Sequence, residues 1–168
     1  MEKMKKHKII KQVPLDKNCF ASNESACEGI GLKVYITEDE YVVGICKTKV
    51  CHQGYANTVH GGIICTYFDE VLWYSTIVKD SNVFAVTAEL NIKYLQALPT
   101  EEDIKIIGEP VCQSGRHLYT KGYILANDDK RIAEATAHFI IVKPDHRVSN
   151  TMLDLCCGDD EMPMEMIF

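Results

Sequence analysis

The sequence lacks any run of about 18 apolar residues, the length that a membrane-spanning helix needs. The lysine-rich residues 1–11 are followed by no apolar segment of about 7–15 residues, so no secretory signal is predicted. Basic residues are not in excess, because 18 Lys and Arg stand against 24 Asp and Glu, for a formal net charge of -6. Nucleic-acid binding needs a basic surface. These absences predict a cytoplasmic protein with no membrane span and no nucleic-acid partner.

The eight cysteines include no pair with C-x-x-C spacing, and the six histidines show no spacing typical of metal ligands. Cys46 and Cys65 fall inside apolar runs, where cysteine behaves as a small hydrophobic residue. We therefore predict reduced, mostly structural thiols, with no metal and no cofactor. The adjacent pair Cys156-Cys157 is the candidate for oxidation.

The composition is that of a globular protein, since 46% of the 168 residues are hydrophobic and 25% are charged. Strand-like patterns begin near residue 31 and end near residue 143. We therefore predict one domain over residues 31–143, an N-terminal extension of residues 1–30 and a C-terminal tail of residues 144–168. The tail is acidic and rich in methionine, which fits either a surface-packed or a partly disordered segment.

One helix and several strands are expected within this domain. Residues 61–79 are apolar almost all round the helical circumference, which indicates a buried helix. The strands are recognised by β-rich composition between turn residues and are expected at residues 32–37, 41–49, 84–97, 103–113, 117–126 and 131–143. Small alanines alternate along the last strand, as if the helix packs closely on that face. The pattern predicts an α+β fold with a single antiparallel sheet curled around one helix.

The helix begins at His60-Gly61-Gly62, a loop-to-helix junction. Two glycines let a ligand approach the backbone closely. The first N–H groups of a helix have no partner within the helix, and with the helix dipole they stabilise negative charge. Such amides suit a thioester carbonyl that becomes an oxyanion. The alternative is a plain tight turn into a helix.

Asp69 lies in the middle of this predicted buried helix. A buried carboxylate is unfavourable unless it is paired or functional, and no cation stands at i±3 or i±4. It is either an Asp hydrogen-bonded to a neighbouring group or a carboxylate that acts as general base or nucleophile. Glu70 points about 100° away around the helix, so only one of the two carboxylates faces a substrate. We favour Asp69.

The segment Asn57-Thr58-Val59-His60-Gly61-Gly62, followed after six residues by Asp69-Glu70, resembles the PaaI-like branch of the hotdog-fold thioesterase superfamily. The resemblance covers roughly residues 31–142 and implies a hotdog fold and hydrolysis of an acyl or aryl-acyl thioester of coenzyme A. It implies that Asp69 activates water or attacks the carbonyl, and that Thr87 orients Asp69 or the water. It also implies that His60 polarises or orients the carbonyl and that the N–H groups of Gly61 and Gly62 form the oxyanion hole.

The substrate-binding candidates are less specific. Gln53, in an entry loop that resembles the family's, and Asn57 are candidates next to the turn. Lys93 and Arg116 are candidates for the phosphates of coenzyme A, although each is equally well explained as solvated surface charge. Strand alternation conflicts with the role implied for Thr87. It places Thr87 on the face opposite Val86 and Ala88, away from the helix, unless a β-bulge intervenes.

Helix geometry predicts an oligomer. Gly61 and Asp69 are eight positions apart, so they lie about 12 Å apart along the helix axis. One carbonyl must lie about 3 Å from both the oxyanion donor and the attacking group, and one straight helix cannot provide that. Two antiparallel helices across a two-fold axis can. We expect a homodimer with two composite sites, alone or as a homotetramer built from two dimers.

Two other functions fit the sequence. A hotdog hydratase or dehydratase also pairs a His with a carboxylate, and a non-catalytic acyl-CoA-binding module would hold the same ligand without turnover. The aromatic residues Tyr67, Trp73 and Tyr74 suit either an aromatic or medium-chain acyl pocket or plain core packing. Acyl-CoA is the expected substrate in the thioesterase interpretation, which we favour.

Overall fold

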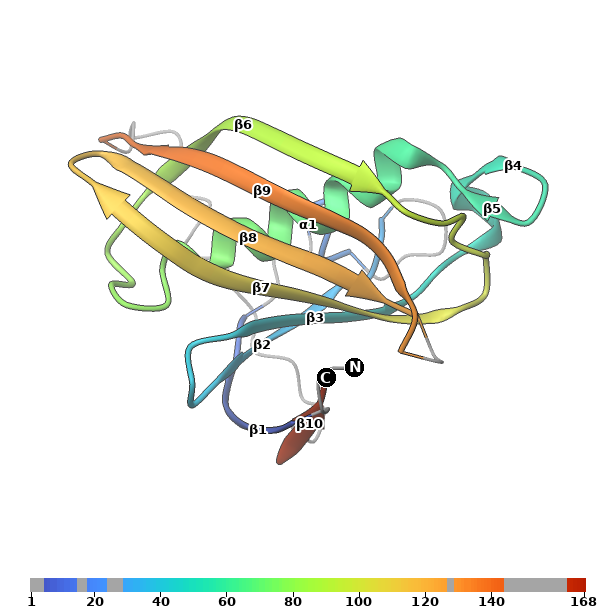
Figure 1. The fold of residues 1–168 in the computed structure, drawn as a ribbon, viewed down its shortest axis with the longest axis horizontal. Helices are drawn as coiled ribbons and strands as arrows, with labels where there is room; N and C mark the ends of the chain where they lie inside the picture. The colour runs from blue at the N-terminus through green and yellow to red at the C-terminus, as the bar shows by residue number, and fades with distance from the viewer. Residues whose placement is uncertain (1–4, 15–17, 24–28, 127–128, 144–162) are drawn as a thin grey trace.

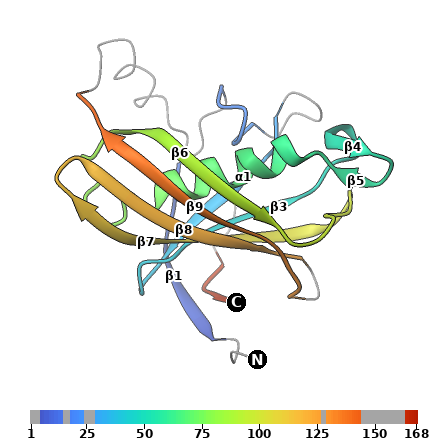
Figure 2. The ribbon, with the colours of Figure 1, turned by 45° about the horizontal axis from the view of Figure 1, so that its top comes forward.

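The computed structural model describes residues 5–14, 18–23, 29–126, 129–143 and 163–168. A single α-helix, α1 (Gly61–Tyr74), packs on one face of an eight-stranded sheet, in which every pairing is antiparallel (Figure 1). Figure 2 shows the sheet curling around this helix. In spatial order the strands are β10 (Glu165–Ile167), β1 (Lys6–Gln12), β2 (Lys33–Thr37), β3 (Val42–Lys47), β7 (Asp103–Ser114), β8 (His117–Leu125), β9 (Arg131–Ile141) and β6 (Ala85–Tyr94).

The chain enters the helix through a short hairpin. The 3-10 turn η1 (Val50–His52) leads into β4 (Gln53–Tyr55), which pairs with β5 (Thr58–Val59). His60 follows immediately and ends the hairpin. This hairpin projects from the end of the sheet where the helix begins (Figure 1).

The predicted arrangement of one antiparallel sheet around one central helix is confirmed. Strands β1 and β10 were not predicted, and both lie outside the predicted domain of residues 31–143. Strand β1 pairs with β2, and β10 pairs with β1, so the sheet extends beyond that range. The division into a domain and two extensions stays a prediction, and Cys156-Cys157 lie outside the described residues.

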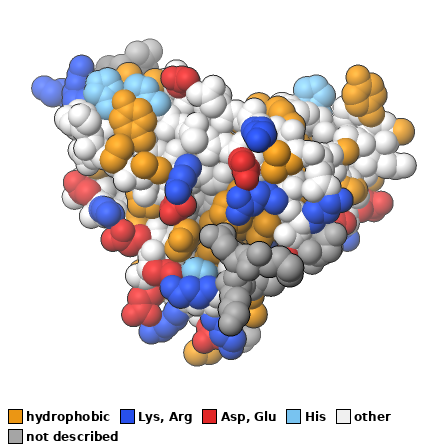
Figure 3. All heavy atoms as spheres, viewed as in Figure 1, with side chains coloured by type: hydrophobic (Ala, Val, Ile, Leu, Met, Phe, Trp, Pro, Cys, Tyr) orange, Lys and Arg blue, Asp and Glu red, His pale blue; other side chains and the backbone are white. Residues whose placement is uncertain are grey.

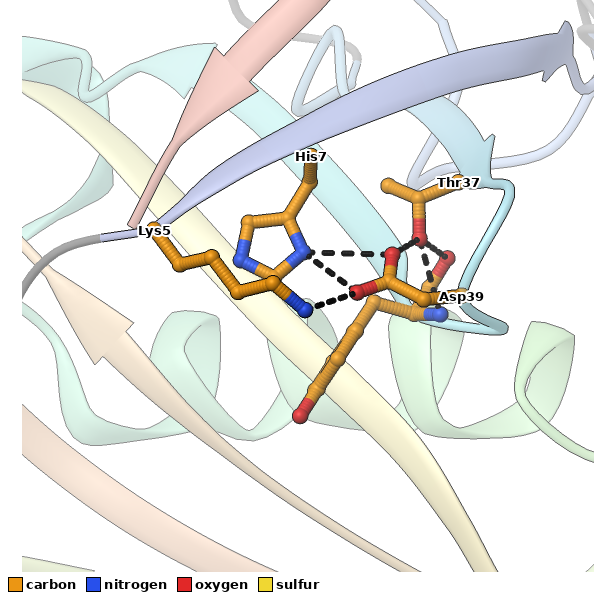
Figure 4. Close-up of polar contacts among 5 residues, drawn as sticks. Lys5, His7, Thr37 and Asp39 are labelled. Atoms are coloured by element: carbon orange, nitrogen blue, oxygen red, sulfur yellow. Dashed lines mark hydrogen bonds and ion pairs between the residues drawn. The ribbon is translucent and has the colours of Figure 1, made fainter.

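A polar cluster holds β1 against the turn between β2 and β3 (Figure 4). The His7 Nδ1 atom lies 2.9 Å from Asp39 Oδ2, the Lys5 ammonium lies 3.4 Å from the same oxygen, and the Thr37 hydroxyl donates to Asp39 Oδ1. The Phe168 ring stacks on His7 at 3.8 Å. Burial raises the pKa of Asp39, but hydrogen bonds from Thr37 and His7 outweigh it and hold this pKa below its usual value.

The core lies between the helix and the sheet. The buried side of α1 carries apolar side chains. The sheet residues that face them are small, as the alanine pattern predicted. A Cβ at Gly108 would lie 3.0 Å from Val71, and one at Gly122 would lie 3.0 Å from Leu72. The helix residues buried there are Ile64, Tyr67, Phe68, Val71 and Leu72, and the facing alanines are Ala133, Ala135 and Ala137.

The helix is shorter than predicted, because it ends at Tyr74 and not near residue 79. The side chains beyond it bond to the last helical carbonyls. Ser75 Oγ donates to Val71 O at 3.0 Å, and Thr76 Oγ1 donates to Trp73 O at 2.7 Å. Hydroxyl side chains that bond to local backbone in this way favour turns over further helix.

The described residues contain no helix that is long and apolar enough to cross a bilayer. On the face seen in Figure 3, acidic and basic side chains are interspersed.

Candidate functional site

The start of α1 leaves one backbone amide available. His60 is the N-cap, and its Nδ1 atom accepts the N–H of Gly62 at 2.9 Å. No hydrogen bond to the Gly61 N–H is found in the described part of the chain. Gly61 and Gly62 were both predicted as oxyanion donors, but the cap occupies the Gly62 N–H. The free donor at the helix start is therefore the Gly61 N–H.

The same cap fixes the tautomer of His60. A ring nitrogen that accepts a hydrogen bond carries no proton, so Nδ1 is the unprotonated nitrogen. In the neutral ring the proton is then on Nε2. The exposed His60 side chain can thus present a second donor, Nε2–H, beside the Gly61 amide.

A groove of about 500 Å³ opens beside this helix start. Its lining includes His60, Gly61 and Ile64 at the helix start, and Tyr94 with residues 95–98. None of its described lining residues is Asp, Glu, Lys or Arg. The groove therefore suits an uncharged part of a ligand and not a phosphate.

Asp69 lies two turns further along the helix, where its side chain is half-buried. The Thr87 hydroxyl donates to Asp69 Oδ1 at 2.8 Å, so the structure brings these two predicted residues together. A hydrogen bond to an ionised carboxylate is stronger than one between neutral groups. No described residue forms a hydrogen bond to the second carboxylate oxygen, Oδ2, which is open to a water or a substrate atom.

A β-bulge turns Thr87 toward the helix. Thr87 pairs with Phe139 and Glu89 pairs with His138, so Ala88 is an extra residue in β6. The strict alternation that placed Val86 on the buried face was wrong, because Val86 is 44% exposed. Before the bulge, Ala85 and Thr87 face inward. After it, Leu90 and Ile92 pack against the core.

The two functional ends of α1 stay apart within one copy of the chain. The helix is continuous from Gly61 through Asp69, so the expected separation of about 12 Å along its axis holds. His60 and Gly61 lie at the start of the helix, whereas Asp69, with its partner Thr87, lies two turns further along it. A single copy does not bring them to one carbonyl.

Gln53 and Asn57 contact each other and not the rest of the predicted site. The Gln53 Oε1 atom accepts the backbone N–H of Asn57 at 3.3 Å. Asn57 has a φ of 58°, in the left-handed region where Asn is one of the better tolerated residues. Their observed interactions are those of the turn between β4 and β5.

Lys93 and Arg116 lie far from each other. Lys93 is near the end of β6, whereas Arg116 is in the turn between β7 and β8. The neighbouring His117 shares a cross-strand row with Ile140 and Val86, and Val86 is seven positions from Lys93 along β6. Seven strand residues span about 23 Å. Both side chains are exposed, and they cannot hold the same phosphate group within one copy.

Sequence reasoning missed Tyr94. Its hydroxyl donates to Gly61 O at 3.1 Å and lies 3.3 Å from Cys65 Sγ. Burial raises the pKa of Tyr94 to about 12, and Cys65 adds to this effect. Alternation along the strand could have indicated it. After the bulge at Ala88, Leu90, Ile92 and Tyr94 share the inward face.

The described cysteines and histidines form neither disulfides nor a metal site. The structure places none of the described cysteines in a disulfide bond; these are Cys19, Cys46, Cys51, Cys65 and Cys112. Among the residues that the structure describes, no group of three or more His, Cys, Asp or Glu side chains is placed to hold a metal ion.

His52 contacts the start of the helix through its backbone and should make the fold sensitive to acid. Its ring is 6% exposed, and neither ring nitrogen has a hydrogen-bond partner among the residues that the structure describes. Its carbonyl accepts the His60 N–H at 2.9 Å. Burial, and secondarily the charge of Lys49, lowers the pKa of His52.

A lowered pKa in the folded state means that the unfolded chain binds the proton first, at about pH 6.5. The free energy of unfolding should therefore fall as the pH drops below this value. The melting temperature of a His52→Phe variant, followed from pH 8 to pH 5, should fall less steeply than that of the wild type. Parallel curves for the two proteins would show that His52 does not contribute.

Residues 56–133 match the family model of the thioesterase superfamily. The chain is 30% identical over 122 residues to acyl-coenzyme A thioesterase THEM4 of Mus musculus, a match that covers 70% of this chain and 52% of that protein. The chain thus spans about half the length of the curated relatives that it matches most extensively.

Solved structures share the fold. Zebrafish thioesterase superfamily member 2 superposes with a TM-score of 0.64 at 19% identity, over 75% of this chain and 90% of that one. A hypothetical thioesterase of Streptococcus pneumoniae, solved with coenzyme A, gives a TM-score of 0.55 at 25% identity, over 61% of this chain and 81% of that one. Residues 56–133 thus resemble the thioesterase superfamily, and the curled sheet around one helix is the fold of its solved members.

Proposed function

We propose that this protein hydrolyses acyl thioesters of coenzyme A, with Asp69 as general base or nucleophile. The observation that carries the proposal is the hydrogen bond from Thr87 to Asp69, which holds one carboxylate oxygen and leaves the other free. The similarity to an acyl-coenzyme A thioesterase and to a thioesterase solved with coenzyme A supports the substrate class.

The chemistry assigned to Asp69 has two forms. As a base, Asp69 Oδ2 takes a proton from water while the water oxygen bonds to the thioester carbon. The tetrahedral intermediate then collapses, the C–S bond breaks, and the thiolate leaves to take up a proton. As a nucleophile, Asp69 forms a mixed anhydride with release of the thiolate, and water hydrolyses that anhydride.

The helix start is the proposed oxyanion hole. The Gly61 N–H is the free amide there, and His60 would add its Nε2–H. Both donors act with the positive end of the helix dipole behind them. In this position they stabilise the negative charge that develops on the carbonyl oxygen in the transition state.

A second copy of the chain completes the proposed site. One edge of the described sheet is β6, a strand of ten residues, most of whose side chains are exposed. Such an edge is a ready template for pairing with another strand. Antiparallel pairing of two β6 strands would set two α1 helices side by side, with Asp69 of each near His60 and Gly61 of the other.

The uncharged groove at the helix start is the proposed place for the acyl group or the pantetheine arm. An aromatic or medium-chain acyl group suits its apolar walls, as the PaaI-like resemblance implies. Lys93 and Arg116 remain candidates for the phosphates of coenzyme A, and their separation means that they would serve different phosphates or different sites.

A thiol-release screen tests this function. Purified protein is incubated with aromatic, short, medium and long acyl-CoAs, and free coenzyme A is measured with a thiol reagent. Release should occur with aromatic or medium-chain substrates, with one carboxylic acid formed for each thiol. Binding of acyl-CoA without thiol release would instead support a binding module, and addition of water across an enoyl-CoA would support a hydratase.

Replacement of Thr87 by Val, which keeps the side-chain shape, should lower kcat by about 10–100-fold. The reason is that one hydrogen bond to a charged group contributes roughly 1.5–3 kcal/mol. The KM should change little, because Thr87 contacts Asp69 and not the substrate. Thr136→Val, on the exposed outer side of β9, is the matched control and should retain the wild-type kcat. Equal activity of Thr87→Val and wild type would remove Thr87 from the site.

A further inference from the structure

Strand β6 contacts both functional ends of α1 through hydroxyl groups. Thr87 donates to Asp69, as described above, and Tyr94 donates to the carbonyl of Gly61 at 3.1 Å. The first contact concerns the carboxylate. The second concerns the first residue of the helix, where the family resemblance assigns no tyrosine.

The Tyr94 contact constrains a specific peptide unit. The Gly61 carbonyl and the Gly62 N–H belong to the same peptide plane, since a peptide bond is planar. Tyr94 Oη holds the carbonyl side of this plane, and His60 Nδ1 holds the N–H side at 2.9 Å. Two side chains from different elements therefore fix one peptide between them.

This peptide opens α1, so its carbonyl also accepts the helical i+4 hydrogen bond, and the two side chains add to that constraint. It joins two glycines, whose backbones have more freedom than those of other residues. A rotation of the plane would release the Gly62 N–H from the His60 ring and so free that ring to turn. The direction of His60 Nε2–H therefore depends on this plane, whereas the Gly61 N–H belongs to the preceding peptide.

The Tyr94 side chain is itself well placed for this role. Because its hydroxyl proton goes to Gly61 O, its oxygen can accept from the Cys65 thiol at 3.3 Å. The ring also lines the groove at the helix start, beside His60 and Gly61. Its hydroxyl therefore bonds to the helix, while its ring forms part of the wall.

We propose that Tyr94 is a positioning residue, which orients the Nε2–H of His60, one of the proposed oxyanion donors, by fixing the Gly61–Gly62 peptide. The inference rests on the proposed hydrolase function. It assigns Tyr94 no contact with the reacting atoms. Tyr94 acts through the backbone of Gly61 and through the ring of His60.

The variant Tyr94→Phe removes only the hydroxyl and keeps the ring in the groove wall. Loss of a neutral hydrogen bond of up to about 1.5 kcal/mol corresponds to a decrease in kcat of up to about tenfold. The KM should stay within about twofold, because the wall is unchanged. Tyr119→Phe is the matched control, because the Tyr119 ring lies on the outer face of the sheet against His138. Loss of the Tyr119 hydroxyl should change neither kcat nor KM.

Amide hydrogen exchange gives a second readout that needs no activity. In Tyr94→Phe the Gly62 amide should exchange faster than in the wild type, because its acceptor His60 Nδ1 is less well held. The amides near Asp69 should keep their wild-type rates, which shows that the helix as a whole remains folded. Tyr119→Phe should leave the Gly62 amide unchanged.

The outcomes separate the two proposals. A lower kcat with an unchanged KM and faster Gly62 exchange supports the positioning role. A higher KM with an unchanged kcat would make Tyr94 a substrate contact and overturn it, as would wild-type values for both kcat and Gly62 exchange. If the wild type releases thiol from no acyl-CoA, the proposed hydrolase fails, and the contact of Tyr94 with the helix start is decided by Gly62 exchange alone.

Discussion

Replacement of Asp69 by Asn is expected to lower kcat for thiol release by about 10²–10⁴-fold, the range that a positioned acid or base contributes. The amide has nearly the shape of the carboxylate and can still accept the Thr87 hydroxyl proton through Oδ1. It cannot take a proton from water or attack a carbonyl carbon. The KM should therefore change far less than kcat, measured by the initial rate of coenzyme A release.

Glu70 provides the matched control, because it is the next residue and carries the same charge. It points about 100° away around the helix and is also half-buried. Glu70→Gln should keep kcat within about twofold of the wild type. Loss of activity in Glu70→Gln with retention in Asp69→Asn would transfer the catalytic role to Glu70 and contradict the assignment.

The second large effect is expected at the other end of the helix. His60→Ala should lower kcat by about 10²–10³-fold, as removal of one oxyanion donor does in other enzymes. Loss of the N-cap should also destabilise the fold, by about 1 kcal/mol. His60→Asn restores a good N-cap without the imidazole, so it separates the two effects: it should recover stability but not activity. Recovery of both would limit His60 to a structural role.

The main elements of the fold could be predicted because they follow strong local patterns. The helix is apolar on nearly all sides, and β9 alternates alanine with larger residues. Strands β1 and β10 escaped prediction for a physical reason. Their register depends on partners distant in the chain, as in the stacking of Phe168 on His7, and no local periodicity reports such contacts.

The candidate site was predicted in its residues more than in its geometry. The pattern from His60 to Asp69 supplied both groups of candidate residues on the helix. The position of Thr87 depended on a bulge at Ala88, which alternation alone cannot reveal. Tyr94 was missed because its contact with Gly61 joins residues 33 positions apart in the sequence.

The central claim is that one site takes Asp69 from one copy of the chain and His60 with Gly61 from another. Asp69→Ala and His60→Ala are purified separately, shown to be folded by their melting curves, and then mixed in equal amounts under conditions that allow subunit exchange. Each variant alone should be nearly inactive.

Random exchange makes half of the dimers mixed, and each mixed dimer holds one intact composite site of two. The mixture should therefore regain about a quarter of the wild-type rate of thiol release. A mixture that exchanges subunits, as shown by differently tagged copies, yet stays as inactive as its parts would contradict the composite site.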